Sequence, residues 1–217
     1  MTDSNHKTIN KNYRWQKLFK LKSLSFILKS IIFYASFSAA FSLLGIFPIL
    51  EQFLPKSYLI GSPLEVSGIS IEHLIGHVIF GMVVGVVSVR IRYIAIAGIF
   101  PIALDADHLI QFLNLESIPR MGHSILFGFI SIPLMMLFVG KKDYLLGAVS
   151  FSAVLAHVSF DILRDGITSF PLFIPIINKM ITFQGYDWIV FLLVAIAIVG
   201  ITGIITKNHA EHKPQET

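Results

Sequence analysis

The sequence contains no cysteine, which excludes disulfide bonds and any metal site built on thiolates. It is also poor in charge, because Asp, Glu, Lys and Arg make up only 14% of its 217 residues, against about 25% in soluble domains. Hydrophobic residues account for 54% of the chain. This composition excludes an ordinary soluble domain and indicates an integral membrane protein, with room for about five to seven spans.

Apolar runs bounded by glycine, proline and charged residues predict an all-α, polytopic bundle of about six transmembrane helices. The predicted spans are Ser25–Leu50, Ile71–Val89, Tyr93–Asn114, Gly122–Val139, Tyr144–Leu163 and Asp187–Thr206. They form a single domain over residues 24–206, which a basic tail precedes at 1–23 and a polar tail follows at 207–217.

Two longer connections hold the proline and glycine residues that break helices. Residues 51–71 are expected to form an irregular outer loop, apolar enough to lie against the membrane as a lid. Residues 165–186 are expected to form a second outer loop, in which the apolar stretch Phe170–Ile177 can be re-entrant or interfacial.

The basic residues predict the orientation of the bundle. With six spans, thirteen Lys and Arg residues fall on the side of the termini and four, Lys56, Arg120, Arg164 and Lys179, on the other. The positive-inside rule therefore predicts cytoplasmic termini in a multi-pass protein of the inner, cytoplasmic membrane. Six of the thirteen precede the first apolar run, which suits anionic lipid headgroups as partners, and no nucleic-acid-binding fold accompanies them.

Three ionisable side chains lie within the five residues Leu104-Asp-Ala-Asp-His108, at the end of an apolar run. A charge at the centre of a membrane costs roughly 2.5–3.5 kcal/mol on insertion scales, so ionisable residues there are rare and usually functional. Two carboxylates with an imidazole suggest a bound cation, and their ligand atoms suit Zn²⁺, with Mn²⁺ and Fe²⁺ as alternatives.

Other spans carry ionisable residues at the same predicted depth. The residues in the outer halves of four spans are His73, His77, Asp105, Asp107, His108, His123, His157 and Asp161. The assignment of spans did not use these residues, so their common depth is an independent sign that they meet in one site.

The spacing of these residues supports metal binding. His157 and Asp161 are four residues apart, and Asp105 and His108 are three apart, so each pair shares a helical face. Asp107 points elsewhere on a regular helix and can bind a second ion or orient a neighbouring imidazole. The predicted ligands, His77, Asp105, Asp107, His108, His123, His157 and Asp161, are numerous enough for two or more ions.

Each residue also has a purely structural interpretation. His73 on its own is more often a packing or interfacial histidine than a ligand, and only one of His73 and His77 needs to face the site. The His157–Asp161 pair can be a buried neutral hydrogen bond, and Arg120 can pair with a carboxylate or anchor its span. Gly81 and Gly85 form a small-residue pattern that is typical of helix packing.

In order along the chain, the motifs are His77-x-x-x-Gly81, Leu104-Asp-Ala-Asp-His108, Arg120-Met-Gly-His123-Ser124 and His157-x-x-x-Asp161. This order resembles the YdjM-type family of membrane-bound metal-dependent hydrolases over about Ile71–Pro175. Leu104 stands where that family has proline, and Arg120-Met-Gly replaces its His-Arg-Gly-x-Thr. The ligand order is more distantly similar to that of zinc-dependent phospholipase C and P1-type nucleases, which are all-helical enzymes.

The resemblance implies a metal-dependent hydrolase. A two-metal site suits phosphoester hydrolysis, and its depth favours a lipid or lipid-linked substrate. Asp107 or Asp165 is expected to act as the base, and Arg120 to hold a phosphate. Two alternatives remain open from the residues: a cation or proton transporter that uses the same cluster, and a non-enzymatic scaffold whose polar network fixes helix packing.

Overall fold

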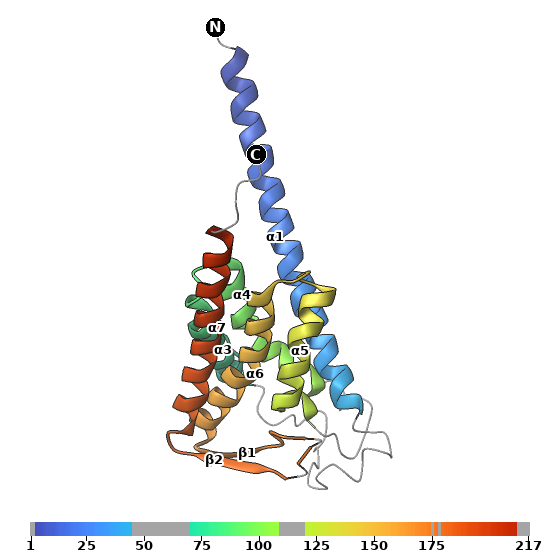
Figure 1. Cartoon of the computed structure of the whole chain (residues 1–217), viewed down its shortest axis with the longest axis vertical. Helices are drawn as coiled ribbons and strands as arrows, with labels where there is room; N and C mark the ends of the chain where they lie inside the picture. Colours follow the sequence, from blue (N-terminus) through green and yellow to red (C-terminus); the bar gives the residue numbers. More distant parts are fainter. Residues whose placement is uncertain (1–2, 45–69, 109–119, 175, 178, 212–217) are drawn as a thin grey trace.

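The computed structural model describes residues 3–44, 70–108, 120–174, 176–177 and 179–211, and among these the side chains from residue 21 to residue 208. Six α-helices make up most of this part of the chain (Figure 1). Their bounds are α1 Asp3–Leu43, α3 Ile71–Val86, α4 Ile91–Leu104, α5 Ile125–Phe138, α6 Tyr144–Asp165 and α7 Asp187–Glu211. The predicted all-α class is therefore confirmed.

Three helices are long and apolar enough to cross a membrane, and they contain Leu21–Leu43, Tyr144–Asp165 and Asp187–Asn208. The other three are shorter than predicted, with 16 residues in α3 and 14 in each of α4 and α5. At 1.5 Å per residue these are roughly 21–24 Å long, which is less than the hydrocarbon core of about 30 Å. Several ligand candidates lie where these short helices begin or end.

The basic N-terminal segment is part of the first helix. The sequence predicted a separate tail at residues 1–23, but α1 runs without a break from Asp3 to Leu43. Proline and glycine, which would end a helix, are absent from this range of the sequence, so the helix continues through the lysine-rich stretch. Residues 51–69, which make up most of the predicted outer lid, lie outside the described residues.

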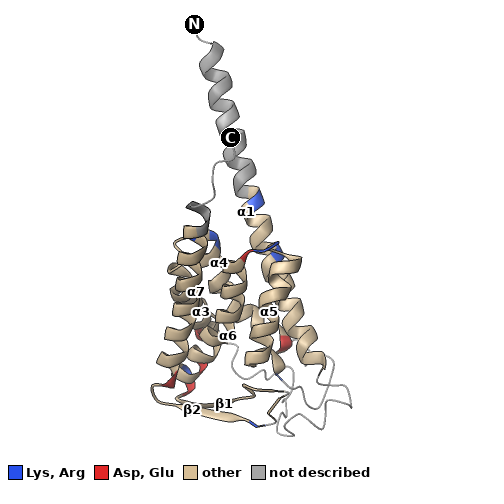
Figure 2. Ribbon diagram, viewed as in Figure 1, with Lys and Arg blue, Asp and Glu red and all other residues tan. Residues whose placement is uncertain are grey.

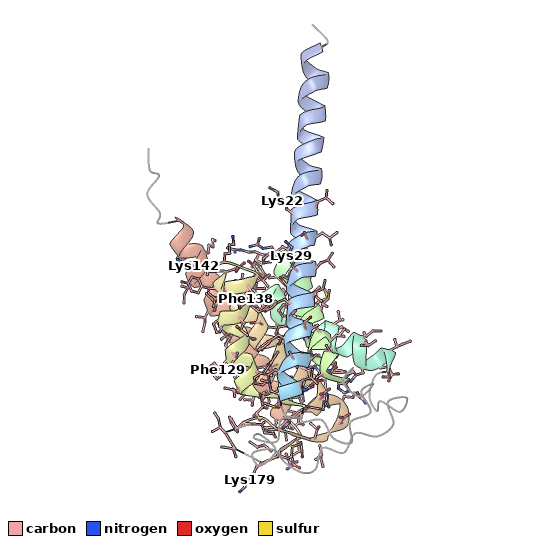
Figure 3. All side chains as sticks on the ribbon, turned by 90° about the vertical axis from the view of Figure 1, so that its right-hand side faces the viewer. Lys22, Lys29, Phe129, Phe138, Lys142 and Lys179 are labelled. Carbon is pink, nitrogen blue, oxygen red and sulfur yellow. The ribbon has the colours of Figure 1, made fainter. Side chains whose placement is uncertain are left out.

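The first and last helices share one end of the bundle. The N-terminal end of α1 and the C-terminal end of α7 lie at the top of Figure 1, and a short hairpin lies at the bottom. The ribbon in Figure 2 is coloured for Lys and Arg near the top of the bundle and for several acidic residues near the hairpin. Lys22, Lys29 and Lys142 lie toward one end and Lys179 at the other (Figure 3).

Aromatic side chains fill the middle of the bundle. Tyr34 of α1 stacks on Phe100 of α4, with ring centroids 4.2 Å apart, and meets Phe127 of α5 edge-on at 5.4 Å. All three are fully buried. The Tyr34 hydroxyl donates to the carbonyl of Ser150 in α6 at 2.9 Å. These contacts tie α1, α4, α5 and α6 together.

The predicted loop at 165–186 contains a β-hairpin that the sequence interpretation missed. Strands β1 (Ile167–Phe170) and β2 (Ile181–Gln184) pair antiparallel, with Ile167 opposite Gln184 and Phe170 opposite Ile181. Gly166 and Gly185 flank the pair with φ of +72° and +59°, a conformation that glycine adopts at little cost. β-Branched and aromatic residues in both strands were the available signal.

The hairpin connection folds beneath the end of the bundle. Phe170, Leu172 and Ile174 are buried, and the Leu172 carbonyl accepts a hydrogen bond from the Ile125 amide at 2.8 Å. The predicted apolar stretch Phe170–Ile177 thus packs, over its first part, on the start of α5.

Helices α3 and α4 approach each other at Gly81. A Cβ atom at this position would lie 2.0 Å from the Ala97 carbonyl oxygen and 2.9 Å from the Gly98 Cα. Pro101 lies inside α4 and has no N–H to donate to the carbonyl four residues earlier, which is that of Ala97. The glycine therefore permits close backbone packing, which holds the histidines of α3 next to the end of α4.

We expect Gly81→Ala to destabilise the protein, because backbone atoms rather than a flexible side chain occupy the place of the new methyl group. Overpacking of this kind costs about 1–3 kcal/mol in the free energy of unfolding. Thermal unfolding in detergent measures the change as a lower melting temperature. Gly200→Ala in α7 is the control, because the nearest atom to its added Cβ would be 3.8 Å away. Equal melting temperatures for the two variants would contradict this account of the contact.

Candidate metal centre

Histidines and carboxylates, most of them buried, meet at the hairpin end of the bundle from helices α3 and α6 and from two short 3₁₀ segments. They form three overlapping groups whose ligand atoms lie within 4.8 Å of one another. The groups are Asp105, Asp107, His108 and His123; then His73, His77 and Asp161; and then His77, Asp105 and His157. All seven predicted metal ligands therefore lie in one cluster, and His73 lies in it as well.

Helix α3 supplies two histidines from its first two turns. Ser70 caps the helix and accepts a hydrogen bond from the His73 amide at 3.1 Å. The Nε2 atoms of His73 and His77 are 3.0 Å apart, and His77 Nε2 lies 3.3 Å from Asp161 Oδ1. The prediction that only one of the two needs to face inward understated the role of α3, because both rings point into the cluster. Their i,i+4 spacing was the signal.

Asp105 is the centre of the cluster. It follows the last residue of α4 and begins a 3₁₀ segment at 105–108. Its Oδ1 lies 3.2 Å from His108 Nε2, 3.3 Å from His123 Nε2 and 3.6 Å from His157 Nε2. Its Oδ2 lies 3.4 Å from His73 Nε2. One carboxylate thus faces imidazoles from four separate segments of the chain.

Helix α6 contributes the predicted His157–Asp161 pair. His157 Nε2 lies 3.1 Å from Asp161 Oδ2, one turn further along the helix. His157 Nδ1 lies 2.8 Å from the carbonyl oxygen of Pro101, which can only accept a hydrogen bond. The proton of the neutral ring therefore sits on Nδ1, and the lone pair of Nε2 points into the cluster.

His123 lies in a 3₁₀ turn, Met121–His123, immediately before α5. Its Nδ1 lies 3.5 Å from Asp107 Oδ2, which also accepts a hydrogen bond from the Ser42 hydroxyl at 3.1 Å. Asp107 is fully buried behind the imidazole. This is the position of a carboxylate that orients a ligating histidine, which the sequence analysis gave as one role for Asp107. A buried position suits the predicted role of catalytic base less well.

Two arginines lie at the edge of the cluster. Arg120 Nη2 donates to Asp105 Oδ1 at 3.2 Å and to His123 Nε2 at 2.7 Å. Arg164, in the last turn of α6, donates from Nη1 to His73 Nδ1. Its Nε lies 3.3 Å from Asp165 Oδ1, and Asp165 is 43% exposed at the end of the helix. The sequence analysis named Arg120 and Asp165 as catalytic candidates but gave Arg164 no role.

The donor atoms fit a divalent cation. His123 Nε2 and His157 Nε2 lie 3.0 Å apart. His157 keeps its proton on Nδ1, so its Nε2 lone pair faces the cluster, whereas the lone pair of His123 Nε2 accepts a hydrogen bond from Arg120. A divalent ion bound by both Nε2 atoms would take the place of the Arg120 hydrogen at His123. Ligands at 2.0–2.1 Å from a tetrahedral ion are about 3.3 Å apart, which matches the separations between these nitrogens and Asp105.

The buried hairpin residue Phe170 covers His123. The two rings lie 6.4 Å apart and are nearly parallel, with an interplanar angle of 11°. On the other side, His77 stacks on His157 at 4.0 Å, and Phe160 meets His77 edge-on at 4.8 Å. Phenylalanine rings thus lie against His123 and His77 at the two sides of the cluster.

No family model, curated protein or solved structure matches this chain. The conclusions about function below therefore depend on the residues and their geometry.

Proposed function

We propose that the protein is a multi-pass membrane hydrolase with a divalent-metal centre at the hairpin end of its bundle. The observation that supports this most directly is the convergence of three potential ligand atoms: His123 Nε2 and His157 Nε2 lie 3.0 Å apart, and Asp105 Oδ1 lies 3.3 Å and 3.6 Å from them. Neutral imidazole and carboxylate are ligands for Zn²⁺, Mn²⁺ or Fe²⁺, and overlapping ligand groups favour two ions. The family resemblance of the sequence motifs points to the same chemistry.

We propose six spans with both termini in the cytoplasm. Three helices are long and apolar enough to cross a membrane. The N-terminal end of α1 and the C-terminal end of α7 lie at the same end of the bundle, which agrees with an even number of crossings (Figure 1). The lysines that Figure 3 labels near that end agree with a cytoplasmic location. The metal centre then lies at the outer end of the bundle, where it meets substrates of the outer leaflet.

The substrate class that fits this position is a phosphoester in a lipid or a lipid-linked molecule. A divalent ion held by the cluster supplies an activated water and charge for the leaving oxygen. Asp105 would be shared between groups of ligands, and Asp107 would keep the His123 ring in place. Arg120 would donate to a phosphate oxygen from the edge of the cluster. Between the two candidate bases, Asp165 is the one that solvent reaches.

A transporter would need a polar route from the cluster to the opposite end of the bundle. The middle of the bundle instead contains the stacked rings of Tyr34 and Phe100, with Phe127 against them. All three side chains are fully buried. These buried aromatic rings favour an enzyme that is open at one end over a conduit.

Removal of metal tests the proposal. We expect purified protein to hold about two Zn²⁺ or Mn²⁺ ions per chain, by inductively coupled plasma mass spectrometry. Hydrolysis of p-nitrophenyl phosphate or a phospholipid should stop when a chelator removes the ions and return when they are added back. Vesicles that contain the protein should show no metal or proton flux. Metal-free protein with full activity, or flux without hydrolysis, would overturn the proposal.

A further inference from the structure

Two guanidinium groups contact different members of the metal cluster. Arg120 reaches Asp105 and His123 from the turn before α5, whereas Arg164 reaches His73 from the end of α6. The two arginines come from segments far apart in the sequence. Asp105, which Arg120 contacts, lies 3.4 Å from His73, which Arg164 contacts. Each arginine side chain remains about one-third exposed, at 30% and 34%. Part of each arginine side chain is therefore exposed among the described residues.

Formal charges indicate what kind of ligand suits this arrangement. The cluster and its edge hold four carboxylates, Asp105, Asp107, Asp161 and Asp165, and the two guanidinium groups. With neutral histidines, these groups carry a net charge of about −2. Two bound divalent ions would change that net charge to about +2. A terminal phosphate group with two negative charges cancels that excess, whereas a phosphodiester, with one, leaves a positive charge uncompensated.

Guanidinium geometry supports the same choice. A planar guanidinium donates to two oxygens of one phosphate at once, and it binds such groups more strongly than neutral donors do. A phosphomonoester exposes three terminal oxygens, enough for contacts to the ions and to both arginines. A diester exposes only two, and its second ester group would have to occupy the space next to one of the guanidinium groups.

We propose that Arg120 and Arg164 select a terminal phosphomonoester on a membrane lipid, with Arg164 as the residue that distinguishes monoester from diester. This inference rests on the proposed hydrolase function. In the reaction, a water oxygen forms a bond to phosphorus and the bond from phosphorus to the ester oxygen breaks. One water proton ends on the leaving alcohol, and inorganic phosphate is the other product.

A purely structural role for Arg164 is the competing explanation. Under this explanation, the contact of Arg164 with His73 holds that ring and the pairing with Asp165 stabilises the end of α6, and Arg164 does not bind the substrate. A structural arginine would affect metal content and stability, but it would not change the preference between two phosphate esters. The two roles therefore differ in a measurable way.

The test uses metal-loaded, full-length protein in phosphatidylcholine vesicles that contain either phosphatidic acid, a monoester, or phosphatidylglycerol, a diester. Diacylglycerol formation is the common readout. We expect the unmodified protein to prefer phosphatidic acid. Arg164→Gln should raise the KM for phosphatidic acid on the order of 10- to 100-fold, the effect of losing a hydrogen bond to a charged group. Its activity on phosphatidylglycerol should fall less than its activity on phosphatidic acid, so that the ratio of the two kcat/KM values changes, and its zinc content should stay within a few-fold.

A readout without turnover uses inorganic phosphate as the probe. Phosphate should raise the melting temperature of the unmodified, metal-loaded protein, because it binds only the folded state. This shift should disappear in Arg164→Gln and be partly retained in Arg164→Lys, which keeps the charge and loses the planar fork. Lys179→Gln is the matched control, because it removes a positive charge at the same end of the bundle (Figure 3).

Three results would overturn the inference, and they separate it from the proposed hydrolase. If Arg164→Gln loses zinc and activity on both lipids in parallel, Arg164 only positions His73. If the unmodified protein cleaves phosphatidylglycerol as well as phosphatidic acid, the preference for a monoester is wrong and the hydrolase stands. If metal-loaded protein cleaves neither lipid nor p-nitrophenyl phosphate, the hydrolase proposal fails as well.

Discussion

Asp105→Asn is expected to lower kcat/KM by roughly 10³-fold, which corresponds to about 4 kcal/mol of transition-state stabilisation. The asparagine keeps the shape of the side chain but removes the charge of the carboxylate that faces His108, His123 and His157. Asp105 belongs to two of the three overlapping ligand groups. Loss of this carboxylate should therefore weaken the binding of more than one ion. Mass spectrometry of the purified variant should show less than half of the normal metal content.

Asp143→Asn is the control for Asp105→Asn. Asp143 accepts a hydrogen bond from Tyr93 and caps α6, in the turn between α5 and α6. That turn lies at the opposite end of the bundle from the hairpin (Figure 1). The control should leave metal content unchanged and keep the cap of α6, because the asparagine side-chain oxygen can still accept from the Leu146 amide. Full metal occupancy and activity in Asp105→Asn would contradict the assignment of Asp105 as a metal ligand.

His157→Ala is expected to abolish both metal binding and hydrolysis. The ring is fully buried, and its Nε2 faces Asp105 and Asp161 while the Pro101 carbonyl holds Nδ1. The alanine leaves a cavity that His77, which stacks on His157 at 4.0 Å, cannot fill without leaving its own partner. Loss of a ligand and of the neighbouring ring should together reduce activity to the background of the assay.

The melting temperature shows whether the effect of His157→Ala comes from the ion or from the fold. With metal present, unmodified protein should melt well above its chelated form, because the ion binds only the folded state. His157→Ala should melt near the chelated form and should not respond to added Zn²⁺. Ser159→Ala in the same helix removes only a hydrogen bond to the Trp188 carbonyl, so it should keep the zinc response. A His157→Ala protein that still gains stability from zinc would contradict the assignment.

Much of the candidate site was predictable from local spacing. His157 and Asp161 share a helical face because a helix repeats every 3.6 residues, and the structure keeps them 3.1 Å apart at the ligand atoms. The common depth of the histidines and aspartates followed from the alternating direction of successive helices. Neither inference needed the packing of one helix on another, so sequence alone was sufficient.

Other features depended on where helices end. On a regular helix, Asp107 was expected to face a different side from Asp105 and His108. Helix α4 instead stops at Leu104, and the 3₁₀ segment that follows places Asp107 behind His123. The early ends of α3 and α4 and the late start of α5 were likewise missed, because an apolar run shows where a helix is allowed but not where it starts or stops. The hairpin at 167–184 was missed because its strands are four residues each, too short for a clear alternating pattern.

The sequence by itself determined that the chain is a helical membrane protein and which imidazoles and carboxylates gather at one depth. These properties follow from composition and from the repeat of single helices. Only the tertiary structure decided which way each ring faces, that His73 joins the cluster and that Arg164 lies at its edge. The reason is physical: contacts between residues up to 91 positions apart depend on how closely helices pack, and no local pattern encodes that distance.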